Sequence, residues 1–197
     1  MALKPDDYVP GATPLGPDEL SELIASNVST RGQLDELEAA NIAEGLQWAT
    51  GRNRDVLAWG YMEQLHRRMF GRVWRWAGLH RKSEKTIGIA SQDIASALKS
   101  LLDEAREQTR SRSLAPDEIA ARFHYRLTKI HPFAHGNGRH ARMMTDLLLE
   151  QLGGKPFTWG DGDPLHAEDA RQRYIEALRA ADARDYGPLL AFLRPRA

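Results

Sequence analysis

A short loop rich in proline and glycine separates two segments of helical periodicity, and it constrains the fold more than any other feature. The apolar residues of the first segment, 117–130, recur at spacings of three and four, as on one face of a helix: Ile119, Phe123, Leu127 and Ile130. Pro132 disfavours the α conformation at the preceding residue, so this helix should end at His131. A second helix is expected over 138–152, ended by Gly153-Gly154. Two helices must therefore meet at a compact loop.

Helical spacing also predominates in the rest of the chain. It predicts further helices over 17–24, 30–50, 56–70, 93–109, 166–183 and 186–193. The segment 71–92 differs, because glycines punctuate it and the run Thr86-Ile87-Gly88-Ile89 favours a small extended hairpin. The expected fold class is all-α, a helical bundle with one short β element.

The 197 residues are enough for one good-sized core, so a single domain is expected over residues 17–197. Residues 1–16 hold three of the ten prolines and two glycines, which is typical of an extended N-terminal arm. Within the domain, residues 17–50 would form N-terminal helices. Residues 51–197 would form the core of the fold, with the hairpin near 81–90.

Composition narrows the classes of function. The formal net charge is zero, whereas a protein that neutralises many phosphates usually has a basic excess, so no nucleic-acid partner is expected. The chain has no cysteine, which excludes disulfides, cysteine-based zinc sites and thiol nucleophiles. No apolar run approaches the length of a signal peptide or a bilayer span, so no membrane contact is expected. These features predict a cytoplasmic protein.

The loop after residue 130 combines three groups that suit phosphate chemistry. Gly136-Asn137-Gly138 lets backbone amides turn toward one point, just before a helix whose first N–H groups face the same way. Arg139 and Arg142 lie three residues apart in the first turn of that helix and would attract an anion. His131 stands beside them and can act as a base near neutral pH. A base, an anion site and two cations are what the transfer of a phosphate ester requires.

The run His131-Pro-Phe-x-x-Gly-Asn-Gly-Arg-x-x-Arg142 resembles the signature of the Fic (Fic/DOC) family, whose members modify proteins, most often by transferring AMP from ATP to a hydroxyl side chain. The segment from Leu65 to Gly78, followed by Arg81, also resembles the family. Residues 85–89 fall where that family places its flap, a β-hairpin that holds the target chain by strand-like pairing. The resemblance covers roughly residues 40–152, and it implies a Fic-type helical bundle.

The resemblance implies a role for each residue of the motif. His131 would deprotonate the target hydroxyl, and Phe133 would be structural. Asn137 and the amides of Gly136 and Gly138 would hold the α- and β-phosphates of ATP. Arg139 would offset charge on the leaving pyrophosphate, and Arg142 would bind the γ-phosphate. The flap residues Thr86, Ile87, Gly88 and Ile89 would bind the target.

One position departs from the pattern of the family. His135 stands where the family usually has an acidic residue that holds Mg²⁺, and imidazole is a poor ligand for this hard ion. His135 would instead contact phosphate as a cation or favour a softer metal. A zinc site made by His131, His135 and His140 is a further alternative.

A second departure concerns inhibition. Many Fic proteins carry an inhibitory helix with the pattern Ser/Thr-x-x-x-Glu-Gly/Asn, whose glutamate pairs with the second arginine of the motif. Ala40-Asn-Ile-Ala-Glu44-Gly45 resembles it, with alanine in place of the hydroxyl residue. Glu44 would then pair with Arg142 and block the γ-phosphate. Two alternatives are that Glu44 only solvates an exposed helix face, or that Glu36 or Glu38 is the partner.

Three hypotheses about function follow. The first is a nucleotidyltransferase, a Fic-type protein adenylyltransferase that uses ATP, is inhibited by Glu44 and modifies a protein target or itself, alone or as an oligomer. The second keeps the fold but moves a phosphoryl group or another nucleotide, because His135 replaces the metal-binding carboxylate. The third is a weakly catalytic nucleotide-binding module, paired with a partner as in toxin–antitoxin systems.

Overall fold

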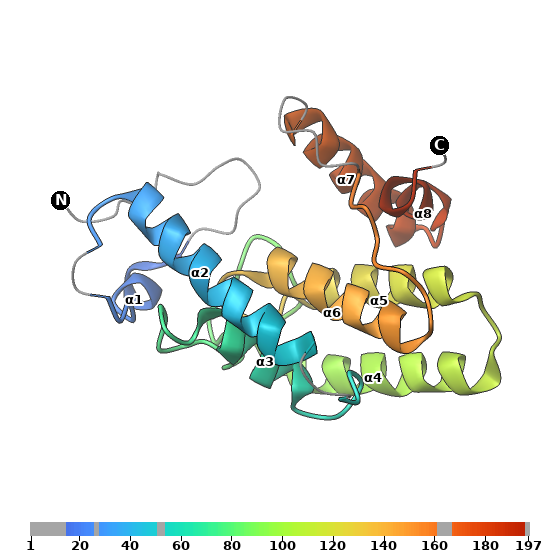
Figure 1. Cartoon of the computed structure of the whole chain (residues 1–197), viewed down its shortest axis with the longest axis horizontal. Helices are drawn as coiled ribbons and strands as arrows, with labels where there is room; N and C mark the ends of the chain where they lie inside the picture. Colours follow the sequence, from blue (N-terminus) through green and yellow to red (C-terminus); the bar gives the residue numbers. More distant parts are fainter. Residues whose placement is uncertain (1–14, 26–27, 51–53, 161–166, 196–197) are drawn as a thin grey trace.

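The computed structural model describes residues 15–25, 28–50, 54–160 and 167–195, and these ranges fold into helices joined by turns and loops (Figure 1). The helices are α1 (Pro17–Leu20), α2 (Arg31–Thr50), α3 (Tyr61–Phe70), the 3₁₀ turn η1 (Ser91–Asp93), α4 (Ile94–Ser111), α5 (Pro116–Ile130), α6 (Asn137–Gln151), α7 (Ala167–Asp182) and α8 (Gly187–Leu193). The all-α expectation is therefore confirmed. No helix in these ranges is long and apolar enough to cross a membrane.

Local chemistry places the ends of these helices close to where the sequence predicts them. Thr30 caps α2 by accepting a hydrogen bond from the Gln33 amide (3.3 Å), while the Gln33 side chain accepts one from the Thr30 amide (3.2 Å). α5 starts with Pro116, whose missing N–H costs nothing in the first turn. α6 follows Gly136, which has a φ of 75°.

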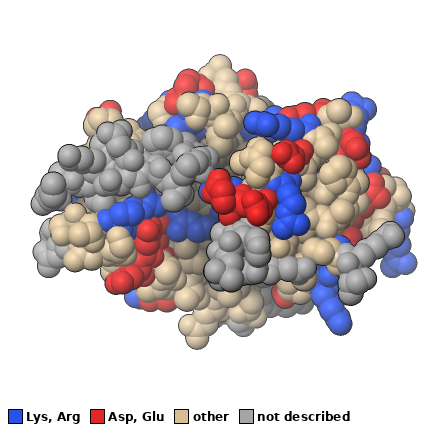
Figure 2. All heavy atoms as spheres, turned by 90° about the horizontal axis from the view of Figure 1, so that it is seen from above, with Lys and Arg blue, Asp and Glu red and all other residues tan. Residues whose placement is uncertain are grey.

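Helices α4, α5 and α6 lie side by side, and α2 packs along α3 at the other end of the molecule (Figure 1). The approach of α2 to α3 is close, since a Cβ on Gly45 would lie 2.8 Å from the Met69 side chain. The main core fills the space between these helices, and a smaller apolar cluster joins α7 and α8 to α5 and α6. Acidic and basic side chains are interspersed on the face shown in Figure 2.

Residues 81–90, called the flap below, do not form the expected hairpin. No strand ladder is present in the described ranges, whose only bridges are single pairs joining Leu23 to Trp74 and His80 to Phe133. The reason is that the Arg81 guanidinium donates to the carbonyls of both Ser83 (2.9 Å) and Ile89 (2.5 Å). These carbonyls accept from a side chain instead of from the backbone amides of a facing strand. Most of the predicted N-terminal arm, residues 1–14, lies outside the described residues, although Leu15 is buried in the core.

Candidate active site

His131 occupies the end of α5 as the sequence predicts, in a left-handed conformation with a φ of 52°. Its carbonyl accepts a hydrogen bond from Arg81 Nε (2.8 Å), and only 7% of the residue is exposed. Burial, followed by the positive charge of Arg81, lowers the pKa of His131 to about 4, although a hydrogen bond with the Thr128 backbone acts in the opposite direction. The imidazole is therefore neutral at pH 7 and able to accept a proton.

Two hydrogen bonds between the Asn137 side chain and the Phe133 backbone fix the conformation of the loop after His131. Asn137 Oδ1 accepts from the Phe133 amide (2.9 Å) and Asn137 Nδ2 donates to the Phe133 carbonyl (2.8 Å). The side chain of Asn137, expected to hold phosphate, is thus engaged with the backbone of the loop. Phe133 is fully buried and stacks on the ring of His66 (3.7 Å between centroids), as expected for a structural residue.

His66 fixes the same loop from α3. Its Nδ1 accepts from the Gly78 amide (3.0 Å), so its Nε2 carries the proton and donates to the His135 carbonyl (3.1 Å). Burial lowers the pKa of His66 well below its ordinary value, and burial likewise lowers that of His140 to about 4, where Nε2 lies 3.0 Å from the Met62 carbonyl. Both rings are neutral and structural, and they hold the motif loop in place.

Arg139, in the first turn of α6, meets a buried carboxylate from α2. Its Nη2 lies 2.6 Å from Glu38 Oε2, and the Glu38 side chain is fully buried. The other carboxylate oxygen, Oε1, accepts a hydrogen bond from Trp74 Nε1 (2.7 Å). The first amides of α6 have no acceptor within the helix and add a partial positive charge here. A carboxylate from the chain therefore lies where the sequence predicts an anion site.

Glu44 does not reach Arg142. It forms an exposed ion pair with Arg72 instead (2.6 Å). The expected pairing fails because of helical register: the buried positions of α2 are Leu34, Glu38, Asn41, Gly45 and Ala49, and Glu44 lies off that face. Of the alternatives raised by the sequence, Glu38 is the glutamate that contacts a motif arginine.

Arg142 turns toward the C-terminal part of the chain. Its guanidinium lies over the rings of Trp159 (5.6 Å) and Tyr174 (5.5 Å). The side chain of Tyr174 is fixed by His124, whose Nε2 lies 2.8 Å from the phenol oxygen. The structure thus gives the two motif arginines different surroundings, although the sequence predicts one shared anion between them.

His135 lies beside the Glu38–Arg139 pair and is 7% exposed. Arg139 Nη2 lies 3.1 Å from His135 Nε2, and because a guanidinium only donates, this ring nitrogen accepts. Among the described residues, no three histidine, aspartate or glutamate side chains are grouped so as to hold a metal ion, so His131, His135 and His140 do not form the zinc site considered above.

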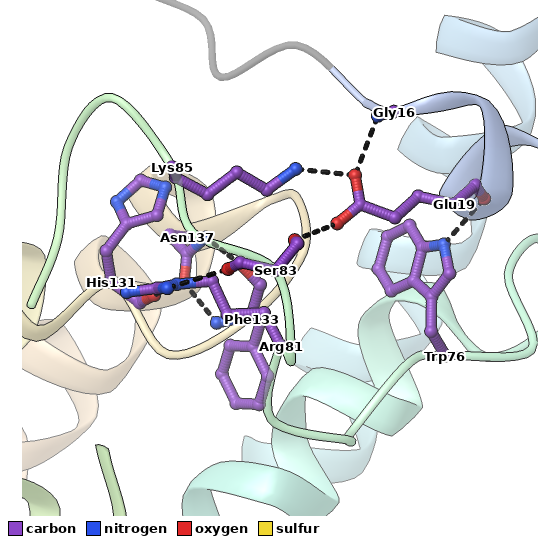
Figure 3. Close-up of polar contacts among 9 residues, drawn as sticks. All are labelled: Gly16, Glu19, Trp76, Arg81, Ser83, Lys85, His131, Phe133 and Asn137. Carbon is purple, nitrogen blue, oxygen red and sulfur yellow. Dashed lines mark hydrogen bonds and ion pairs between the residues drawn. The ribbon is translucent and has the colours of Figure 1, made fainter. Parts of the chain in front are cut away.

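The flap covers one side of His131 (Figure 3). Gly88 has a φ of 114°, and a Cβ there would lie 2.7 Å from Arg81 Nη2 and 2.9 Å from His131 Cβ, so the flap can pass this close only with glycine at that position. Thr86, Ile87 and Gly88 are exposed, while Ile89 is half-buried. The residues expected to bind a target therefore lie beside the base.

The sequence pattern raises Glu38 only as an alternative, and it does not identify the contacts that Arg81 and His66 make with the motif loop. A signal existed for Glu38, because it is a carboxylate on the face of α2 that carries Leu34 and Gly45. The contact of Arg81 with His131 crosses 50 residues of sequence, and no local pattern shows it.

The described residues thus form an all-α fold in which the buried, neutral imidazole of His131 lies at the end of α5, next to the N-terminus of α6. Residues 59–149 match the model of the Fic/DOC family, and the chain carries a Fic/DOC-family domain.

Related proteins agree with this assignment. "Protein adenylyltransferase Fic" of Drosophila willistoni is 30% identical over 135 residues, which cover 66% of this chain and 26% of that protein. The protein of the same name from Drosophila virilis is 35% identical over 83 residues, covering 42% and 16%. The chain thus spans a small part of the length of these relatives.

Solved structures share the fold. The N-terminal Fic domain of a putative cell filamentation protein from Bartonella quintana has a TM-score of 0.67 at 20% identity, covering 83% of this chain and 82% of that one. BepC from Bartonella tribocorum, solved with bound AMPPNP, has a TM-score of 0.68 at 18% identity and covers 90% and 96%.

Proposed function

We propose that this chain transfers AMP from ATP to a hydroxyl side chain of a protein, with His131 as the general base. The observation that carries the proposal is the neutral imidazole of His131, held at the end of α5 beside the N-terminus of α6. The adenylyltransferase name of the relatives supports this choice of reaction.

The proposed step is a displacement at the α-phosphorus. The imidazole of His131 takes the proton of the target hydroxyl, and the oxygen of that group forms a bond to the α-phosphorus. The bond from this phosphorus to the bridging oxygen of the β-phosphate breaks, and pyrophosphate leaves. The first amides of α6 and the guanidinium of Arg139 would stabilise the negative charge that develops on the phosphates.

Glu38 would inhibit this reaction in the conformation described. Its carboxylate lies 2.6 Å from Arg139 Nη2, so a phosphate group must displace it to gain the same guanidinium. The pair is favoured because Trp74 Nε1 also donates to the carboxylate, which is itself fully buried. In this proposal Glu38 takes the inhibitory role that the sequence pattern suggested for Glu44.

The residues present do not fit a site for Mg²⁺ built on the motif. At the position where related sequences usually have a carboxylate, His135 offers a ring nitrogen that already accepts from Arg139. We therefore assign no step to a metal held by this residue. The same observation favours a second candidate function, the transfer of a phosphoryl group or another nucleotide, since the carboxylate that would hold a metal against the phosphates is replaced by His135.

Labelled ATP distinguishes these reactions. The Glu38→Gln protein, which keeps an acceptor for Trp74 but loses the negative charge, is incubated with α- or γ-labelled ATP, each with Mg²⁺, with Mn²⁺ and without divalent metal. Adenylylation predicts protein-bound α label without γ label, and a gain in intact mass equal to an adenylyl group. Protein-bound γ label would point to phosphoryl transfer instead.

Two variants serve as controls. His131→Ala in the Glu38→Gln background should abolish the label, and label retained at the same rate would overturn the role of the base. Glu44→Gln removes a charge of the same sign from the exposed side of α2 and should leave labelling at the wild-type level.

A further inference from the structure

The carboxylate of Glu19, in the short helix α1, joins the N-terminal part of the described chain to the flap (Figure 3). Its Oε2 lies 2.5 Å from Lys85 Nζ and accepts from the Gly16 amide (2.8 Å), and its Oε1 accepts from Ser83 Oγ (2.8 Å). Two flap residues therefore bind one carboxylate that lies more than sixty residues earlier in the sequence.

This ion pair differs from a surface salt bridge in its burial. The side chain of Lys85 is 7% exposed and that of Glu19 is 16% exposed. Burial alone would raise the pKa of Glu19, but hydrogen bonds from Lys85, Gly16 and Ser83 hold it below its ordinary value. Because water screens such a pair weakly, breaking it by removing one charge should loosen the flap measurably.

Other contacts hold the segment around Glu19 without its carboxylate. The Ile24 amide donates to the Val73 carbonyl (2.8 Å), and the Arg75 amide donates to the Glu22 carbonyl (3.0 Å). Trp76 Nε1 donates to the carbonyl of Glu19 itself (3.1 Å). Neutralising the side chain of Glu19 should therefore leave the segment in place and change only its hold on the flap.

The flap also contacts His131, the proposed base, through Arg81 and Gly88. Arg81 binds the carbonyls of His131, Ser83 and Ile89, and Gly88 lies against the Cβ of His131. The positive charge of Lys85 is also among the causes that lower the pKa of His131. Moving the flap away from Glu19 therefore changes both the access to His131 and its electrostatic surroundings.

We infer that Glu19 is a positioning residue for the transfer reaction: through Lys85 and Ser83 it fixes the flap over His131 and sets where a target hydroxyl meets the imidazole. The positioning role in catalysis rests on the proposed function, whereas the hold of Glu19 on the flap does not. Glu19 lies outside residues 59–149, so the positioning group comes from a part of the chain that precedes the Fic/DOC match.

The test measures flap protection and transfer separately. In the full chain, Glu19→Gln should make hydrogen exchange of the flap amides about tenfold faster than in the wild type. Glu22→Gln is the matched control, since it removes an acidic charge three residues away, at a residue that binds the Arg75 amide through its backbone carbonyl. The swap Glu19→Lys with Lys85→Glu should restore protection, which loss of folding could not explain. Equal exchange in Glu19→Gln, Glu22→Gln and wild type would overturn the inference.

Two further measurements report on the base. Lys85→Met should raise the pKa of His131, followed by NMR titration of its ring protons, because one of the cations that disfavour the imidazolium is removed. In the Glu38→Gln background, Glu19→Gln should slow self-labelling by α-labelled ATP while the Kd for ATP from calorimetry stays unchanged. Unchanged labelling despite faster exchange would overturn the positioning role. Absence of label in every protein, with flap exchange still dependent on Glu19, would overturn the proposed function and leave the structural hold of Glu19 on the flap intact.

Discussion

Glu38 Oε2 and Arg139 Nη2 lie 2.6 Å apart, which places a fully buried carboxylate of α2 against the first motif arginine of α6. The pair couples a helix outside residues 59–149 to the anion site inside them. Since a carboxylate and a phosphate seek the same guanidinium, occupancy of this position by Glu38 and by a nucleotide should be mutually exclusive.

Glu38→Gln should tighten the binding of ATP by about tenfold, because the amide no longer competes for Arg139 with a full negative charge. Isothermal calorimetry with ATP and with the non-hydrolysable AMPPNP measures this change. Glu44→Gln should leave the Kd unchanged. Equal affinities for wild type and Glu38→Gln would refute the competition.

The pH dependence of transfer should reflect the lowered pKa of His131. With a pKa of about 4, the imidazole stays in its basic form from pH 8 down to about pH 5, so the rate of labelling should not fall through the range where an ordinary histidine becomes protonated. Rates in the Glu38→Gln protein, with circular dichroism recorded at each pH to confirm folding, provide the measurement. A loss of activity centred near pH 6.5 would contradict it.

Acid should destabilise the fold below pH 6.5. Burial lowers the pKa of His124 to about 3 and that of His140 to about 4, so between these values and about 6.5 the unfolded chain binds more protons than the folded one. The free energy of unfolding should therefore fall as the pH decreases from 7 to 5. Urea denaturation at both values checks this, and equal midpoints would show that folding does not lower the pKa values of these rings.

Substitutions of Asn137 should lower the free energy of unfolding, by an amount that depends on which hydrogen bonds are lost. Asn137→Ala loses both hydrogen bonds to the Phe133 backbone and leaves buried partners, which should cost about 1–3 kcal/mol. Asn137→Asp keeps the acceptor for the Phe133 amide but buries a carboxylate whose other oxygen faces the Phe133 carbonyl, so its cost should be at least as large. Denaturant midpoints give the order. A stable Asn137→Ala protein defective only in ATP binding would instead make Asn137 a direct phosphate ligand.

Gly88→Ala should displace the flap. The new Cβ would lie 2.7 Å from Arg81 Nη2 and 2.9 Å from His131 Cβ, in a conformation that side chains rarely adopt. Faster hydrogen exchange over the flap and a shifted His131 ring resonance are the expected signals. Gly32→Ala is the control, because a Cβ at that helical position meets nothing within 4 Å. An identical flap in both variants would show that the close approach is not required.

Most helices could be predicted from the sequence because their signals are local. Pro132 ends α5 and the Thr30–Gln33 capping box begins α2, and neither signal depends on tertiary contacts. The position of His131 followed from the same reasoning. The flap could not be predicted in this way. Its β-branched run favours a strand, but the Arg81 guanidinium donates to carbonyls that would accept from backbone amides in a hairpin.

The contact between Glu38 and Arg139 could not be predicted from a local motif, because it depends on which face of α2 is buried. A short motif around Glu44 suggested the wrong glutamate, because it ignored which face of α2 is buried. The glutamate in contact with the site, Glu38, shares a face with Leu34 and Gly45, and its partner Arg139 lies about a hundred residues later. Which arginine it meets depends on how α2 crosses α3, and no local pattern determines that angle.

The close packing of α2 on α3 limits how Glu38 can move away from Arg139. Leu34 and Gly45 are buried on either side of Glu38, and Gly45 approaches Met69 too closely for any larger side chain. Lifting α2 from α3 would expose this apolar surface to water. The free energy lost would be a sizeable fraction of the free energy of folding. Rotation about the side-chain torsions of Glu38 would leave Leu34 and Gly45 in place on α3. Activation of this chain would therefore be a change of rotamer, reversible at every encounter with a nucleotide, with α2 still docked.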